Sequence, residues 1–357
     1  MPERRWDERD VRIRPGRGSR PRTKQRPAHE DARSAMVVAV DRGRYTLLIE
    51  PGTPDETRVL AMKARELGRE RVVPGDRVDV VGDTSGAKDT LARIVRIGER
   101  RTVLRRTADD TDPVERVIVA NADRLVVVTA LADPEPRTRM IDRCVVAAYD
   151  AGMDVLLALT KADLASPDEL VAMYAPIGVE VVVTRREDDP ATGERRIVGL
   201  DALLEALDGR VSVLVGHSGV GKSTLVNALV PDAHRATGVV NDVTGRGRHT
   251  STSAVALEVP GTSAPTWVVD TPGVRSFGLA HVQPESLVRA FGDLADVAAE
   301  CPRGCTHLAD SPDCALDDWV AEAADDATRD ARTARVDSFR RLLVSRLGTA
   351  EPDEPTR

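Results

Sequence analysis

The sequence has few cysteines and no long apolar run, and both absences exclude classes of protein. Four of the 357 residues are cysteine, and three of these fall within fourteen residues, which a disulfide framework does not explain. No uninterrupted apolar stretch approaches the ~18 residues of a membrane span. The first residues, Met-Pro-Glu-Arg-Arg, have no apolar core behind them, which argues against a secretory signal. We therefore expect a cytoplasmic protein with no membrane partner.

Acidic residues are missing from one stretch near the N-terminus, although the chain as a whole has a net charge of −7. Between Val11 and Arg26 there are seven basic residues and no acid. An acidic body with a basic, Pro/Gly-rich arm is a common layout of nucleic-acid binders. The alternative is a solvated tail without a partner.

The distribution of apolar residues divides the chain into five segments. Five short strand signals, at 36–40, 45–49, 58–62, 72–81 and 91–97, predict a small β-barrel, or else another small β-domain. Buried strands at 124–129, 155–159, 179–183, 211–215 and 267–269 alternate with helical segments such as 137–151, which predicts a parallel sheet covered on both faces. A helix at 284–300, a cysteine-rich segment at 301–314 and helices through Leu347 follow. The expected segments are a basic disordered arm (1–33), a β-barrel (34–108), an α/β domain (109–284), a small helical domain (285–347) and a disordered tail (348–357).

The segment Gly216–Thr224 fits the phosphate-loop pattern G-x-x-x-x-G-K-[ST] and lies between a strand and a helix, as that motif requires. Its glycines let successive N–H groups face inward and bind an anion. Lys222 is expected to reach the β- and γ-phosphates, and the Ser223 hydroxyl to ligate Mg²⁺. Lysine is rare in this chain, five against 46 arginines, and two of the five lie in nucleotide motifs. The candidate phosphate-binding residues are Gly216, His217, Ser218, Gly219, Val220, Gly221, Lys222, Ser223 and Thr224.

Two further motifs complete a nucleotide site. Asp270-Thr-Pro-Gly273 follows an apolar strand, where Asp270 can hold the Mg²⁺ shell and Gly273 can donate its N–H to a γ-phosphate. Thr160-Lys-Ala-Asp163 resembles the base-selecting N/T-K-x-D motif of GTPases, so Thr160, Lys161, Ala162 and Asp163 are candidate base-binding residues. A buried Asp163 accepts two hydrogen bonds from guanine and would be left unpaired by adenine. The base motif precedes the phosphate loop, so the motif order is circularly permuted.

The cysteine-rich segment indicates a metal site. Cys301, Cys305, His307 and Cys314 supply three thiolates and one imidazole, the ligand set of a tetrahedral structural Zn²⁺. A metal also suits a segment too small to bury a core of its own, so we expect one Zn²⁺ per chain. Cys144 lies in an apolar helix and is expected in the core.

From about residue 35 to 345, the chain resembles the small ribosomal subunit biogenesis GTPase RsgA family. The resemblance rests on Val73-Pro-Gly-Asp-Arg-Val78, Ala120-Asn-Ala-Asp123, Ile141-Asp-Arg143, the permuted motifs and the Cys/His segment. It implies an OB-fold at 34–108, a circularly permuted GTPase domain at 109–284 and a zinc-binding domain at 285–347. It also implies GTP hydrolysis on the small ribosomal subunit during late maturation. The spacing C-x3-C-x-H-x6-C departs from the family pattern C-x4-C-x-H-x5-C.

The first switch is expected at Gly245–Thr252, where Thr250 would add to the Mg²⁺ shell. Val274 stands where GTPases carry a water-orienting Gln, and an apolar side chain cannot position water. His249 is the candidate catalytic replacement, and the family resemblance points the same way; contact with RNA or switch packing is the alternative. We expect slow hydrolysis in isolation and faster hydrolysis once RNA orders the switch.

The sequence thus predicts a monomeric assembly factor that binds GTP or GDP with Mg²⁺, and that contacts the small subunit through its rRNA. The subunit would stimulate hydrolysis, and hydrolysis would drive release. Alternatives are an RNA chaperone whose nucleotide domain is only a sensor, a permuted GTPase acting on the large subunit, and a P-loop metabolic kinase. A kinase would leave Thr160–Asp163 without a role.

Overall fold

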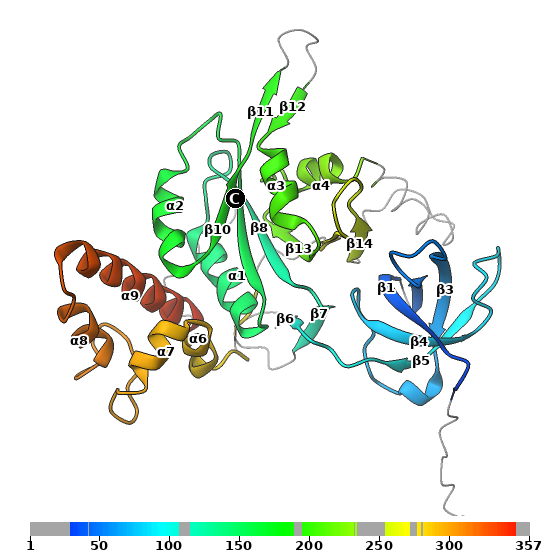
Figure 1. Cartoon of the computed structure of the whole chain (residues 1–357), viewed down its shortest axis with the longest axis horizontal. Helices are drawn as coiled ribbons and strands as arrows, with labels where there is room; N and C mark the ends of the chain where they lie inside the picture. The colour runs from blue at the N-terminus through cyan, green and yellow to red at the C-terminus, as the bar shows by residue number, and fades with distance from the viewer. Residues whose placement is uncertain are drawn as a thin grey trace, which may run out of the picture.

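The structure is a computed structural model that describes residues 29–41, 43–106, 115–188, 195–231, 233, 254–271, 277–279 and 281–347. It contains a β-barrel, a central α/β region and a group of C-terminal helices (Figure 1). Residues 1–28 of the predicted arm and the tail from 348 lie outside the described residues. Within the described ranges, no helix has both the length and the apolar character that crossing a membrane requires.

The first five strands close into a barrel, as the sequence predicted. They are β1 (Arg33–Asp41), β2 (Arg44–Ile49), β3 (Thr57–Lys63), β4 (Arg77–Gly82) and β5 (Ala92–Ile97). They pair in the order β1-β2-β3-β5-β4, and β4 pairs back to β1. Alternate apolar residues such as Val37, Leu47 and Ile94 fill the interior. The order and the closure are OB-like.

The Val73–Val78 motif attaches this barrel to the rest of the molecule. The main chain of Pro74 and Gly75 accepts hydrogen bonds from Ala120 N (3.0 Å) and Asn121 Nδ2 (3.0 Å). Gly75 has φ +86°, and a Cβ there would lie 1.9 Å from the Ala120 oxygen. Only glycine permits so close an approach of the two main chains.

The central sheet places five parallel strands side by side, in the order β10-β9-β8-β13-β15. These are β8 (Arg124–Ala130), β9 (Asp154–Thr160), β10 (Glu180–Val183), β13 (Val211–Gly216) and β15 (Trp267–Asp270). Leu125 and Val127 belong to one apolar core, whereas Val126 and Val128 belong to another, so the sheet is covered on both faces. The covering helices include α1 (Thr138–Asp150), α2 (Asp168–Tyr174), α3 (Leu200–Leu207) and α4 (Lys222–Leu229).

The five predicted strands are parallel, as expected, but a further strand extends the sheet at one edge. β14 (Val255–Glu258) runs antiparallel to β15 and was missed, because four residues carry too little pattern. β14 also pairs with β1 at Val255 and Ala39, which joins the barrel and the central strands into one 11-stranded sheet.

Two hairpins were also not foreseen. The first pairs β6 (Val103–Arg106) with β7 (Arg116–Ala120), and the second pairs β11 (Arg185–Asp188) with β12 (Arg195–Val198). The β11–β12 hairpin stands out from the top of the α/β region in Figure 1. Both strands of this hairpin are rich in charged residues, so neither shows the apolar alternation that signals a strand.

The C-terminal part is helical, as expected, but the single helix predicted over 284–300 is wrong. The chain forms α6 (Pro284–Ala290) and α7 (Gly292–Ala298), separated by Phe291, whose backbone leaves the helical region at φ −110° and ψ 80°. The Phe291 ring packs edge-on between Tyr149 and Phe339. This burial offsets the lost helical turn. α8 (Ala315–Ala321) and α9 (Asp326–Leu347) complete the region, and short 3₁₀ turns lie at η2 (Arg65–Leu67) and η3 (Ala175–Ile177).

Helix α9 is joined to α1 through charged side chains, of which Asp142 and Arg143 on α1 are buried. Arg341 donates to the Asp142 carboxylate at 3.2 Å, and Tyr174 donates to the same carboxylate at 2.9 Å. Arg143 donates to the Phe277 carbonyl at 2.7 Å and to the Ser345 carbonyl at 3.4 Å. The Ile141–Arg143 motif therefore connects the central region with the C-terminal helices. Cys144 beside it is buried, as predicted, and burial raises the pKa of its thiol to about 12.

Candidate functional site

The nucleotide motifs meet at one edge of the sheet. The base motif follows β9, the phosphate loop follows β13 and Asp270 ends β15. Carboxyl ends of neighbouring parallel strands share an edge, where α/β proteins bind ligands. A cavity of about 260 Å³ at this edge is lined by Lys161 and Asp163 of the base motif and by Gly221 and Thr224 of the phosphate loop. The fold thus brings together two segments that are about sixty residues apart in the sequence.

The phosphate loop has the backbone conformation of an anion-binding turn. Gly219 and Gly221 adopt φ +85° and +92°, the left-handed region that glycine favours. Gly216 also has a packing role, because a Cβ there would lie 2.6 Å from the Val128 oxygen. It permits close packing against β8. Helix α4 begins at Lys222, so the N–H groups of its first turn face the loop.

The remaining loop residues occupy different environments. Val220 is buried in the core, whereas Ser218 is exposed. The His217 Nδ1 lies 3.2 Å from the Ser218 carbonyl oxygen, close to the loop's own main chain. Their roles in phosphate binding stay predictions.

Lys222 and Asp270 form an ion pair, which places the predicted phosphate ligand beside the predicted magnesium ligand. The adjoining Thr271 hydroxyl donates to the Leu214 carbonyl at 2.8 Å, which fixes the end of β15 to β13. The Ser223 hydroxyl and the Asp270 carboxylate are hard oxygen donors, the ligand type that Mg²⁺ takes. The other predicted switch residues, His249, Thr250, Gly273 and Val274, lie outside the described residues.

The base motif is held in place by hydrogen bonds to main-chain carbonyls of neighbouring loops. The buried Thr160 hydroxyl donates to the Val220 carbonyl at 2.6 Å, which connects the base motif directly to the phosphate loop. Ala162 N donates to the Thr184 carbonyl at 3.2 Å. Lys161 has φ +58°, and its ammonium donates to the Asp133 carbonyl. These contacts tie the motif to three other loops of the same edge.

Asp163 differs from expectation in its burial. The carboxylate is exposed at the cavity rim, whereas the argument from the sequence needed a buried one. Within the described part of the chain, no side chain donates a hydrogen bond to it, so both oxygens are open to a ligand. If Asp163 is the base-selecting group, the base must cover this carboxylate when it binds.

Seven cavity residues were not predicted: Asp133, Leu164, Thr184, Arg185, Arg186, Ile197 and Leu225. Thr184 follows β10 and could have been found from the rule that residues after parallel strands share an edge. Arg186 and Ile197 come from the β11–β12 hairpin, which left no signal in the apolar pattern.

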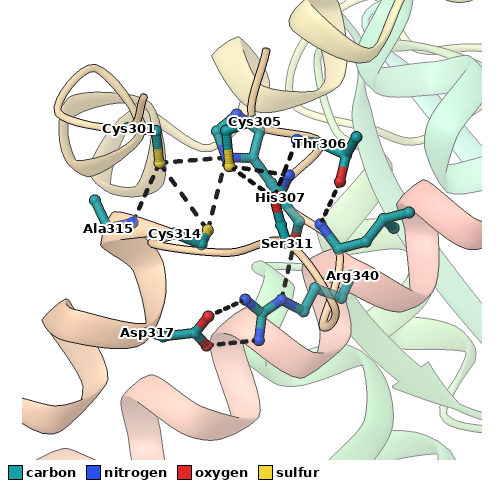
Figure 2. A network of polar contacts seen from close by, with 10 residues as sticks. Cys301, Cys305, Thr306, His307, Ser311, Cys314, Ala315, Asp317 and Arg340 are labelled. Carbon is teal, nitrogen blue, oxygen red and sulfur yellow. Dashed lines mark hydrogen bonds and ion pairs between the residues drawn. The ribbon is translucent and has the colours of Figure 1, made fainter. Parts of the chain in front are cut away.

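The predicted metal ligands form a compact cluster (Figure 2). His307 Nδ1 lies 3.5 Å from the sulfurs of both Cys301 and Cys305 and 3.9 Å from that of Cys314. The sulfurs of Cys301 and Cys314 are 4.0 Å apart, and all four atoms lie within 4.8 Å of one another. Metal bonds of about 2.3 Å to sulfur and about 2.0 Å to nitrogen give tetrahedron edges of about 3.5–3.8 Å. The observed separations therefore fit zinc, including that of Cys301 despite the altered spacing.

The surroundings of the cluster suit a metal centre. The main-chain N–H groups of Ala315 and His307 point to the sulfurs of Cys301 (3.3 Å) and Cys305 (3.4 Å). Burial lowers the pKa of His307, and the Arg340 charge lowers it further, so the imidazole stays neutral as a ligand must. Arg340 also donates to the His307 carbonyl at 3.0 Å, which positions the loop.

The fold and the meeting of a phosphate loop with an upstream base motif define a circularly permuted GTPase. Consistent with this class, a model of the RsgA GTPase family matches residues 97–280. The small ribosomal subunit biogenesis GTPase RsgA of Chlorobaculum parvum is 32% identical over 307 residues, 83% of this chain and 94% of that protein. The chain belongs to the RsgA GTPase family.

Further relatives agree with this assignment. The RsgA protein of Pseudomonas aeruginosa strain LESB58 is 38% identical over 235 residues, and this match spans 64% of each chain. The crystal structure of YjeQ from Thermotoga maritima matches with a TM-score of 0.59 and 25% identity, over 89% of this chain and all of that one. The structure of YloQ, a circularly permuted GTPase, matches with a TM-score of 0.59 at 21% identity, which shows the fold alone.

Proposed function

We propose that this chain is a cytoplasmic GTPase that binds the small ribosomal subunit through its rRNA, acts in late subunit maturation, and is stimulated by the subunit to hydrolyse GTP and leave. The observation that carries the nucleotide part is the shared cavity of Asp163 and the phosphate loop. The ribosomal part is supported by the printed name of the relatives, small ribosomal subunit biogenesis GTPase.

In the proposed site, Asp163 accepts hydrogen bonds from the guanine ring and the first turn of α4 binds the phosphates. Lys222 leaves Asp270 for the β- and γ-phosphates, because their charge exceeds that of one carboxylate. Ser223 and Asp270 fit a magnesium ion and would hold it, with Thr250 as a further proposed ligand; the ion would neutralise phosphate charge. His249 is the proposed group that positions the attacking water.

The Cys301–Cys314 cluster would hold one structural zinc ion per chain. Its role is to fix the loop between α7 and α8, which has few apolar residues of its own. The zinc loop, the barrel and the basic arm are the proposed contacts to rRNA, and the protein would act as a monomer.

Nucleotide binding to the Asp163→Asn variant tests the base contact. The side-chain amide in this variant donates where guanine also donates, so the affinity for GTP should fall about a thousandfold, while the affinity for xanthosine triphosphate should rise. Asp168→Asn, an exposed acid on α2, is the matched control and should leave the preference unchanged. A variant that binds GTP as well as the wild type removes Asp163 from the site.

Single-turnover GTP hydrolysis, measured with and without purified small subunits, tests the ribosomal part. We expect slow turnover alone and at least tenfold acceleration by subunits, because a group held in place lowers the activation barrier. Equal rates under both conditions would favour a nucleotide-sensing RNA chaperone instead.

A further inference from the structure

The β11–β12 hairpin supplies one wall of the nucleotide cavity. The strand register places Arg186 directly opposite Ile197, so their side chains share one face of the hairpin. Both line the cavity together with Asp163 and Gly221. The hairpin therefore adds an apolar side chain and two arginines, Arg185 and Arg186, to a pocket that also contains residues of the base motif and the phosphate loop.

The root of this hairpin is fixed to the sheet. Thr184, just before β11, is buried, and both its main-chain N–H (2.7 Å) and its hydroxyl (3.1 Å) donate to the Leu159 carbonyl. Gly199, just after β12, has φ +86°, and a Cβ there would lie 2.2 Å from the Val183 oxygen. Arg186 is thus presented from a defined place beside the base motif.

The guanidinium of Arg186 points to the phosphate-binding end of α4. Its Nη2 donates to the Thr224 hydroxyl at 2.8 Å. Thr224 lies two residues beyond Lys222 on the first turn of α4, where main-chain N–H groups attract phosphate. Arg185 and Arg196 on the same hairpin both face Glu187, whereas in the described part of the chain no carboxylate pairs with Arg186.

We propose that Arg186 binds the α-phosphate of the nucleotide and slows its release, while Ile197 covers the nucleoside. In a bound nucleotide the α-phosphate lies between the base, assigned to Asp163, and the β-phosphate, assigned to Lys222. Arg186 lines the same cavity as Asp163 and contacts Thr224 on the first turn of α4, so its guanidinium is within reach of a phosphate bound there. A planar guanidinium forms paired hydrogen bonds to phosphate. The assignment rests on the proposed nucleotide-binding function of this site.

Release of radiolabelled GDP and GTP, chased with excess unlabelled nucleotide, tests the proposal on the full-length chain. Arg186→Ala should speed release of both nucleotides about tenfold, as expected for a lost charge-assisted hydrogen bond. Arg186→Lys should show a smaller change, because a point charge replaces the fork. The control Arg196→Ala removes the same charge from the same hairpin and should change release by less than about twofold.

Equilibrium titration with GMP locates the contact, because GMP carries only the α-phosphate. Arg186→Ala should weaken the binding of GMP and of GDP by the same factor. Release equal to that of the wild type, or faster release of GTP alone, overturns the assignment. If the wild type binds no guanine nucleotide, the proposed function fails; if it binds and Arg186→Ala binds equally well, only the role of Arg186 fails.

Discussion

The nucleotide cavity and the cysteine cluster are assembled in opposite ways. The cavity takes its walls from five segments between Asp133 and Leu225, which only the strand order brings together. The cluster takes all four ligands from fourteen consecutive residues. The first site therefore depends on the central sheet, whereas the ligands of the second all come from a single loop.

This difference implies different responses to single substitutions. A side chain at the cavity can be changed without loss of fold, because buried strands such as β8 and β13 carry the architecture. A ligand of the cluster cannot be changed without loss of local structure. Little apolar burial supports the loop from Cys301 to Cys314 without a metal.

The largest effect is expected at the cluster. Cys305→Ser should reduce bound zinc from one equivalent to near zero and lower the free energy of unfolding of the C-terminal part by several kcal/mol, on the order of 3–5. Metal analysis and thermal melts measure the two quantities. Cys144→Ala removes a thiol outside the cluster and should keep the zinc. Guanine-nucleotide affinity should stay within about threefold in both variants; a large loss with Cys305→Ser would contradict the independence of the two sites.

A smaller effect is expected where the base motif meets the phosphate loop. Thr160→Val keeps the shape but removes the hydroxyl that bonds the Val220 carbonyl, leaving a buried acceptor unpaired at a cost of about 1–3 kcal/mol. Nucleotide affinity should fall about tenfold, measured by calorimetric titration. Thr57→Val, on the barrel, removes an exposed hydroxyl bond and should leave affinity unchanged. An unaltered affinity in Thr160→Val would mean that the two motifs are positioned independently.

The smallest effect on stability is expected where helix α1 of the central region meets helix α9. Burial raises the pKa of Asp142 despite the Arg341 charge and the Tyr174 hydrogen bond. A carboxyl with a raised pKa contributes stability below its unfolded pKa and loses that contribution as pH rises through its folded pKa. The stability of the wild type relative to Asp142→Asn should therefore increase as pH is lowered from about 7 to about 4. Denaturant midpoints across this range measure it.

Asp293 provides the opposite control. The Arg335 hydrogen bond lowers the pKa of Asp293, so its contribution is present above the unfolded pKa and is lost as pH falls. The stability of the wild type relative to Asp293→Asn should thus decrease toward low pH. If the relative stability changed with pH in the same direction for both variants, burial would not govern the titration of Asp142.

The sequence predicted those parts that depend on local pattern. The barrel strands, the central strands and the clustering of Cys301, Cys305, His307 and Cys314 follow from alternation, apolar runs and spacing. The missed parts depend on contacts far along the chain. β14 is defined by pairing with β15 and β1, and Phe291 breaks a helix because its ring fits between Tyr149 and Phe339. Arg186 lies on a charged hairpin, and only the folded structure places this hairpin in the cavity wall.

The most direct measurement is a crystal structure of the full chain grown with GDP and Mg²⁺. The base motif and the phosphate loop should hold one nucleotide between them. We expect the guanine ring nitrogen and its exocyclic amine within about 3.2 Å of the Asp163 carboxylate, and the β-phosphate against Lys222. A nucleotide bound elsewhere, or one whose base is turned away from Asp163, would contradict the account.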